Sequence, residues 1–261
     1  MSNNSILLKI ENKVAHITLN RPEVFNSFNR EMALSLQSIL DDCETNKNVR
    51  AIVLTGSGKA FCAGQDLKEV TDPNLNPGFK KILEEHYNPI ITRIRSIKKP
   101  VIAAVNGVAA GAGANIALAC DIVVAHEKVS FIQAFSLIGL VPDSGGTFFL
   151  PRLIGFQKAS ALAMLGDKIG AEEAERMGMI YKCVALDEYE DTINKLGLKL
   201  ANMPTKALGF IKELFNQSMT NTLDEQLALE SKLQIEAANS EDYKEGVAAF
   251  IEKRQPEFKG K

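Results

Sequence analysis

The sequence contains no tryptophan, few tyrosines, few cysteines and no long hydrophobic run. Its four cysteines show no C-x-x-C spacing and lie in apolar stretches, at Cys43, Cys62, Cys120 and Cys183. This usage favours reduced thiols and argues against a disulfide framework or a zinc site. Because no run of about 18 apolar residues occurs and the N-terminus lacks a charged region followed by an apolar one, we expect neither a membrane span nor export, but a cytoplasmic protein.

The chain also lacks an excess of either charge. Its 30 basic and 32 acidic residues leave a formal net charge of -2. No overall basic field is therefore available to attract nucleic acid or an acidic membrane, and a phosphorylated ligand would have to be bound by local lysines. With 261 residues, 46% of them hydrophobic, the chain is long enough for one large core or two unequal ones.

Apolar patterning predicts an α/β fold. Residues 6–19 read as two short strands, 29–43 as a helix with an apolar stripe, and 51–54 and 101–105 as buried strands with a helical segment between them. This alternation favours a largely parallel sheet. From about residue 160 the chain turns mostly helical, with helices expected at 171–178, 186–203, 205–217 and 223–239. The last carries an apolar stripe suited to packing on the core or on another subunit.

Two segments, Lys59–Leu67 and Pro100–Asp121, read as strand, turn and helix in succession. At such a junction several backbone N–H groups have no partner within the helix, and the helix dipole adds partial positive charge. Small residues there let a ligand approach the backbone closely. Two such donors directed at one point would form an oxyanion hole. The alternative is that the small residues Gly111, Ala112 and Gly113 serve only helix packing.

Asp143 lies in the run GLVPDSGGT, residues 139–147, after apolar residues that predict a strand reaching Val141. A single carboxylate on a glycine-bounded turn is suited to moving one proton. Four phenylalanines expected beside it, Phe131, Phe135, Phe148 and Phe149, would raise its pKa and make it a better base toward a carbon acid. Asp143 could instead only shape a Pro-Asp-Ser-Gly turn.

Two other enzyme classes receive little support. The segment Gly111–Ile116 is one glycine short of the dinucleotide fingerprint G-x-G-x-x-G. His16, His86 and His126 have no G-x-S-x-G partner, which argues against a serine hydrolase.

Five segments together carry a resemblance to a known family. They are LNRPEVFNSF (19–28), FCAGQDL (61–67), KKPVIAAVNGVAAGAG (98–113), PDSGGT (142–147) and EGVAAFIEKRQPEF (245–258). In this order they resemble the crotonase superfamily of enoyl-CoA hydratases and isomerases, over nearly the whole chain. The resemblance implies a crotonase-like ββα spiral core that binds acyl-CoA, at residues 1–200. It also implies a C-terminal helical oligomerisation region, at residues 201–261, forming a homotrimer or a dimer of trimers.

The resemblance further assigns roles to individual residues. The oxyanion hole would use the backbone N–H groups of Gln65 and Ala112, with Asp143 as the third catalytic residue. Substrate would be contacted at Phe25, Ala63, Asp66, Leu67, Lys68, Gly111, Asn115, Phe135, Phe250 and Lys253. For Asp66 we prefer a structural role, capping the helix that starts at Leu67. No metal or redox cofactor is implied, since coenzyme A is part of the substrate.

The sequence departs from the family's hydratases where they hold the attacking water. Those enzymes carry two glutamates, whereas the aligned positions here are Asn115 and Phe135. Neither side chain exchanges a proton at neutral pH. Asp143 stands where the family's isomerases place an aspartate. This predicts an isomerase of enoyl-CoA esters. The sequence resembles the branch of the family that converts 1,2-epoxyphenylacetyl-CoA to oxepin-CoA. Phenylacetate breakdown and fatty-acid breakdown are alternative pathways for such an enzyme.

Two alternatives remain. The first is an enoyl-CoA hydratase that uses Asp143 alone to activate water. The second is a non-catalytic CoA-binding or RNA-binding subunit, which the near-neutral charge and the intact oxyanion segment disfavour.

Overall fold

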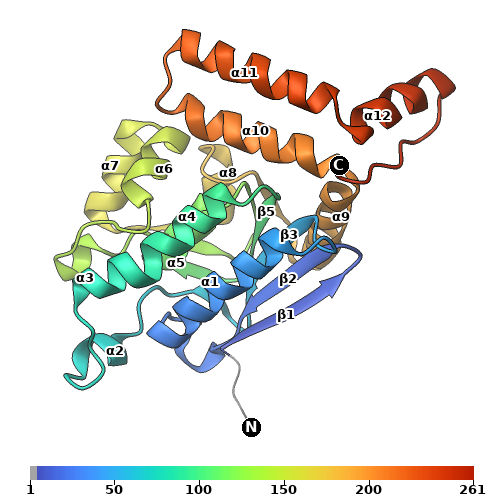
Figure 1. Ribbon diagram of the computed structural model, residues 1–261. Coiled ribbons are helices and arrows are strands. Elements are labelled where there is room, and N and C mark those ends of the chain that lie inside the picture. The colour runs from blue at the N-terminus through green and yellow to red at the C-terminus, as the bar shows by residue number, and fades with distance from the viewer. Residues whose placement is uncertain (1–4) are drawn as a thin grey trace.

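The computed structural model describes residues 5–261, and two β-sheets form its centre (Figure 1). The larger sheet has the strand order β1-β2-β3-β5-β7-β10, with β1 (Ile6–Glu11), β2 (Val14–Leu19), β3 (Ala51–Gly56), β5 (Val101–Val105), β7 (Ile122–His126) and β10 (Lys182–Val184). Only β1 is antiparallel to its neighbour. The second sheet has the order β4-β6-β8-β9, with β4 (Ala60–Cys62), β6 (Val108–Ala110), β8 (Ser130–Ile132) and β9 (Lys168–Gly170). Its first three strands are parallel, so the predicted α/β class is confirmed.

The central strands of the larger sheet are buried on both faces. Ile52 and Leu54 of β3 pack into the main core, while Val53 between them packs into a second cluster with Ile193. Helices α1 (Arg30–Thr45), α4 (Asn88–Ser96) and α5 (Ala112–Ala119) contribute to the main core, and α9 (Tyr189–Asn202) covers the other face. Burial on both faces explains why these strands read as continuous apolar runs.

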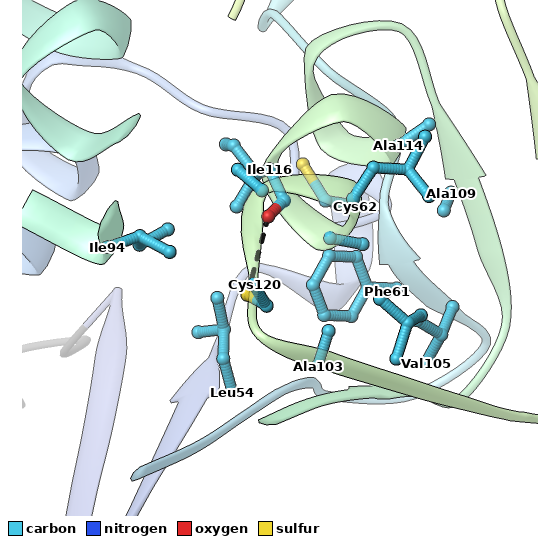
Figure 2. Close-up of a cluster of buried hydrophobic side chains, with 14 of the residues drawn as sticks. Leu54, Phe61, Cys62, Ile94, Ala103, Val105, Ala109, Ala114, Ile116 and Cys120 are labelled. Atoms are coloured by element: carbon cyan, nitrogen blue, oxygen red, sulfur yellow. Dashed lines mark hydrogen bonds between the residues drawn. The ribbon is translucent and has the colours of Figure 1, made fainter. Parts of the chain in front are cut away.

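Helix α5 runs through the middle of the core. Every one of its residues is buried, and Figure 2 shows Ala114, Ile116 and the following Cys120 among side chains of β3, β4 and β5. A methyl group at Gly113 would lie 2.2 Å from the Cys62 carbonyl oxygen, so only glycine allows α5 to approach β4 this closely. The start of α5 is therefore held rigidly against the strand that leads to Gln65.

The C-terminal helices form a separate layer. Helices α10 (Thr205–Ser218) and α11 (Leu223–Ala238) lie side by side, and α12 (Glu241–Glu252) extends away from them (Figure 1). The chain then returns to the body, where Arg50 Nη1 donates to the Phe258 carbonyl oxygen at 2.8 Å. Of the apolar stripe on α11 only Leu233 is buried, whereas Leu223, Leu227 and Ile235 are exposed. One chain therefore leaves most of this stripe uncovered.

Short elements connect these layers. They are η1 (Pro22–Val24), α2 (Leu67–Thr71), α3 (Phe79–Lys81), the π-helix η2 (Ile82–Tyr87), η3 (Ser136–Ile138), α6 (Gly146–Ile154), α7 (Phe156–Leu165), α8 (Ala171–Arg176) and η4 (Leu186–Glu188). The strand predicted to reach Val141 is wrong beyond Ile132. The chain forms the 3-10 helix η3 instead, because Leu137 and Ile138 face outward and Gly139 adopts a left-handed conformation.

All four cysteines are free thiols, three of them buried and Cys183 half-buried. Within residues 5–261, no helix combines the length and the apolar character needed to span a membrane. No cluster of three or more His, Cys, Asp or Glu side chains that could hold a metal ion occurs in the same range.

Candidate active site

Asp143 lies on the turn between η3 and α6. Ser144, directly after it, has a φ of 51°, and the Gly146 N–H donates to the Asp143 carbonyl oxygen at 2.8 Å. The Ser144 hydroxyl donates to Asp143 Oδ1 at 2.8 Å. Burial raises the pKa of the Asp143 carboxyl, and the hydrogen bond from Ser144 partly opposes this. A carboxylate with a raised pKa is a stronger base.

Asn115 on α5 holds this turn from the core side. Its side chain is completely buried, and its Nδ2 donates to the Asp143 carbonyl oxygen at 2.9 Å. A methyl group at Gly146 would lie 2.3 Å from Asn115 Nδ2, so α6 begins in direct contact with α5. Asn115 Oδ1 accepts a hydrogen bond from Gln133 Nε2 at 2.8 Å. The amide predicted to line the substrate site is thus engaged by protein groups on both sides.

The turns that carry Gln65 and Ala112 lie against each other. Gly64 has a φ of 95°, and a methyl group there would lie 3.2 Å from the Ala110 carbonyl oxygen and 3.6 Å from the Ala112 nitrogen. Ala112 is the first residue of α5, where a backbone N–H has no acceptor within the helix. Gly111 before it has a φ of 53°, which favours glycine. The structure therefore brings the two junctions predicted from sequence together.

The Gln65 side chain is gripped by two residues that sequence reasoning missed. Tyr87 Oη donates to Gln65 Oε1 at 2.9 Å, and Gln65 Nε2 donates to Glu69 Oε2 at 2.6 Å. Glu69 Oε1 in turn accepts the Arg30 N–H at 2.8 Å. Burial raises the pKa of the Tyr87 hydroxyl well above its usual value, and the charge of Asp143 contributes, so Tyr87 remains a proton donor. These contacts fix the peptide that carries the Gln65 N–H.

Tyr87 belongs to the π-helix η2, and Glu69 to the short helix α2. Single π-helical turns occur frequently at functional sites. The apolar periodicity of the sequence gives no means of separating a π-helix from an α-helix. For Glu69, the available signal was its position four residues after Gln65, which is contact distance along a helix.

Phe135 forms a wall beside the Ala112 turn. It is buried, and its ring lies 3.7 Å from the place that a methyl group at Gly111 would occupy. Of the phenylalanines expected around Asp143, Phe149 packs under Gly145. Phe148 is exposed and stacks on Arg152, with 3.8 Å from the guanidinium carbon to the ring centre. Phe148 therefore contributes less to the apolar surroundings of Asp143 than the sequence predicted.

Asp66 is the N-cap of α2. Its Oδ1 accepts the Lys68 N–H at 2.9 Å, and its Oδ2 accepts a hydrogen bond from Arg21 Nη2 at 2.7 Å within an ion pair. The carboxylate is buried and satisfied by these contacts. The predicted capping role of Asp66 is confirmed.

A cleft of about 640 Å³ lies next to α2. Its lining includes three basic side chains, Arg21, Arg30 and Lys68, and three acidic ones, Glu31, Asp66 and Glu69. Close by, the Ala63 N–H donates to the Phe25 carbonyl oxygen at 3.0 Å, while the Phe25 side chain is exposed. Leu67 and Lys68 are also exposed. Several predicted substrate contacts thus gather on one surface.

Phe250 and Lys253 lie elsewhere. Both belong to the end of α12, Phe250 is 85% exposed, and Lys253 has the left-handed φ of 55° that ends the helix. Figure 1 places α12 and α2 at opposite ends of the molecule. A single chain therefore does not bring these two residues to the other predicted contacts.

Residues 9–261 match the family described as enoyl-CoA hydratase/isomerase. The chain belongs to the enoyl-CoA hydratase/isomerase family. It is 48% identical over 98% of its length, and 98% of the relative's, to 1,2-epoxyphenylacetyl-CoA isomerase of Escherichia coli. It is 46% identical, over all of both chains, to a protein of Rhodobacter capsulatus named probable enoyl-CoA hydratase.

A solved structure gives the same result. The crystal structure of enoyl-CoA hydratase from Bacillus anthracis superposes with a TM-score of 0.92 at 33% identity, covering 99% of this chain and 100% of that one. The predicted crotonase-like fold is confirmed, and the enoyl-CoA hydratase/isomerase family acts on CoA thioesters. Its named members include isomerases and hydratases, so the choice between the two activities depends on the chemistry of the site.

Proposed function

We propose that the chain is an acyl-CoA isomerase in which Asp143 is the only acid–base residue. The main support for this proposal is the identity and the contacts of the two residues, Asn115 and Phe135, that align with the glutamates of the family's hydratases. Asn115 is bound to the Asp143 carbonyl oxygen and to Gln133, and Phe135 is a buried ring beside the Ala112 turn. A site in which neither of these two positions carries a carboxylate suits proton transfer between two carbons by Asp143 better than addition of water.

The thioester oxygen would lie between the N–H groups of Gln65 and Ala112. With a 3-enoyl-CoA, Asp143 removes a proton from carbon 2, and the electrons move onto the thioester oxygen as a dienolate. The same carboxylic acid then returns the proton to carbon 4, which leaves the double bond between carbons 2 and 3. Loss of one oxyanion donor typically raises the barrier by roughly 3 kcal/mol. A positioned general base such as Asp143 typically raises the rate about 10²- to 10⁴-fold.

For the acyl group, we propose 1,2-epoxyphenylacetyl-CoA as a substrate, rearranged to oxepin-CoA. The relative of that name supports this, as does the flat wall that Phe135 forms beside the Ala112 turn. Coenzyme A would lie along Phe25, Ala63 and Leu67. Its phosphates would meet Lys68, the one basic side chain of the adjoining cleft that forms no ion pair within residues 5–261.

We also propose a cytoplasmic homotrimer or a dimer of trimers. The uncovered apolar residues of α11 support an assembly, and a neighbouring copy would bring its own Phe250 and Lys253 to the coenzyme A. Light scattering coupled to gel filtration tests this, because a monomer at micromolar concentration contradicts it.

The activity is tested with a 3-enoyl-CoA and crotonyl-CoA in parallel, measuring double-bond migration and hydration separately for the wild type and Asp143→Asn. We expect migration without appreciable hydration, abolished by the substitution. Asp167→Asn, at an exposed position, is the matched control. Rapid hydration that Asp143→Asn abolishes would overturn the proposal in favour of a hydratase that uses Asp143. Rapid hydration that survives the substitution would mean that Asp143 is structural. Acyl-CoA binding without any turnover would favour a non-catalytic subunit.

A further inference from the structure

Gln133 is a buried amide that no step above uses. It lies between β8 and η3, is 5% exposed, and donates from Nε2 to Asn115 Oδ1 at 2.8 Å. Asn115 Nδ2 then donates to the Asp143 carbonyl oxygen at 2.9 Å. Two side-chain amides thus link β8, α5 and the turn of the proposed base in series.

The orientation of the Asn115 and Gln133 amides is set by the last acceptor of the series, the Asp143 carbonyl oxygen. A carbonyl oxygen only accepts hydrogen bonds, so Asn115 must turn its NH₂ toward Asp143 and its oxygen toward Gln133. Gln133 must therefore present its own NH₂ to Asn115. This leaves Gln133 Oε1 buried and without a partner among the described residues. An unsatisfied buried acceptor has a desolvation cost, and such groups in native proteins call for an explanation.

The position of Asn115 on α5 explains why this desolvation cost is tolerated. The first residue of this helix, Ala112, offers the proposed oxyanion donor, and Asn115 lies one turn further along the same rigid helix. The strained φ of 51° at Ser144 also indicates that the turn needs external support. A link from α5 to the Asp143 backbone therefore sets the position of the base relative to the oxyanion donor.

We propose that Gln133 and Asn115 are positioning residues that hold the Asp143 turn against α5. This rests on the proposed function for its catalytic readout. Gln133 fixes the orientation of the Asn115 amide that bonds to the Asp143 carbonyl, so loss of either hydrogen bond loosens the turn. Loss of the second has little further effect.

The test compares Gln133→Met, Asn115→Ala and the double variant. Gln133→Met keeps the length of the side chain and removes its donor. We expect each single variant to lower kcat for double-bond migration about tenfold with KM within about twofold, and the double variant to be no slower than the slower single one. The matched control is Gln226→Met, because the Gln226 side chain also donates one hydrogen bond and accepts one, far from the site.

Hydrogen–deuterium exchange of residues 139–147 is the second readout. It is independent of the reaction catalysed. We expect faster exchange of this segment in Gln133→Met and Asn115→Ala, and no change there in Gln226→Met. Unchanged exchange would overturn the inference. Faster exchange with unchanged kcat would show that the link is structural and would overturn the positioning role. A wild type that isomerises nothing would refute the proposed function, and the exchange data would still decide whether the link holds the turn.

Discussion

Two aspartates, Asp121 and Asp143, follow apolar segments of the same chain and have opposite surroundings. Asp121 Oδ2 accepts hydrogen bonds from Lys212 Nζ at 2.7 Å and from the Val101 N–H at 2.8 Å, and Oδ1 accepts one from Arg95 Nη1 at 3.1 Å. These contacts tie α10 and α4 to the start of β5. The carboxylate is surrounded by donors and cations that hold it in place.

Asp143 has one side-chain donor, the Ser144 hydroxyl, and forms no ion pair with any lysine or arginine of residues 5–261. Its backbone, by contrast, is held by Asn115 and Gly146. The comparison shows how one side-chain type serves two purposes. Paired charges make Asp121 a structural anchor, whereas a fixed backbone and an unpaired carboxylate leave Asp143 able to exchange a proton.

The largest effect is expected from breaking the anchor with Asp121→Asn. The Lys212 side chain is 6% exposed, and this substitution leaves its charge buried without a counter-ion. Loss of one partner of a buried pair typically costs about 3 to 5 kcal/mol of unfolding free energy. Urea unfolding measures it, with the exposed pair of Asp191 and Lys195 as control through Asp191→Asn. A small stability loss accompanied by loss of kcat/KM would mean that Asp121 belongs to the site.

The opposite change in stability is expected from Asp143→Asn. Because burial raises the pKa of Asp143 in the folded state, the folded protein binds this proton more tightly than the unfolded chain does. The stabilisation that this bound proton gives the folded state is complete below the pKa of the unfolded chain, near 3.9. It is lost as the pH rises through the pKa of Asp143 in the folded state. At pH 7 we therefore expect Asp143→Asn to be more stable by about 0.5 to 2 kcal/mol, with no difference near pH 3. Thermal unfolding at both pH values checks this, and equal stability at pH 7 contradicts it.

The features that repeat a local pattern could be predicted from sequence. The strands followed from their apolar runs, the Asp66 cap from a side chain that begins a helix, and the Asp143 turn from its glycines. Each depends on neighbours within a few residues. The prediction that one strand continues as far as Val141 was wrong for a related reason, since a run of apolar residues does not reveal that they face outward.

The contacts that complete the candidate site could not be predicted, because they depend on how distant segments pack. Gln133 meets Asn115 only because α5, α6 and β8 converge, and Gly146 allows that approach. Tyr87 reaches Gln65 from a π-helix, whose extra residue per turn changes which side chains face inward. The resemblance to the crotonase family supplied the backbone donors, whereas the side chains that hold them came from the structure.

Tyr87→Phe tests whether the reaction rate also depends on the hydrogen bond that holds the Gln65 side chain. The substitution keeps the ring and removes the hydroxyl that donates to Gln65 Oε1. Because a hydrogen bond of this kind contributes about 0.5 to 1.5 kcal/mol, we expect kcat for double-bond migration to fall about three- to tenfold. The pH dependence below neutrality should keep its position, because Asp143 keeps its own donor. A rise in KM alone, with kcat unchanged, would place Tyr87 in substrate binding instead.

Ser144→Ala produces the smallest change and makes Asp143 still less like Asp121. Burial already raises the pKa of the Asp143 carboxyl, and the Ser144 hydroxyl lowers it by hydrogen bonding to the ionised form. Removing that hydroxyl raises the pKa further, so the acid limb of kcat/KM should move to higher pH while the plateau changes about twofold or less. The base must be ionised to act, and the wild-type limb should itself lie above the range of an ordinary aspartate. Profiles of wild type and Ser144→Ala between about pH 4 and 9 measure both positions. A limb that moves to lower pH would mean that the titrating group is not Asp143.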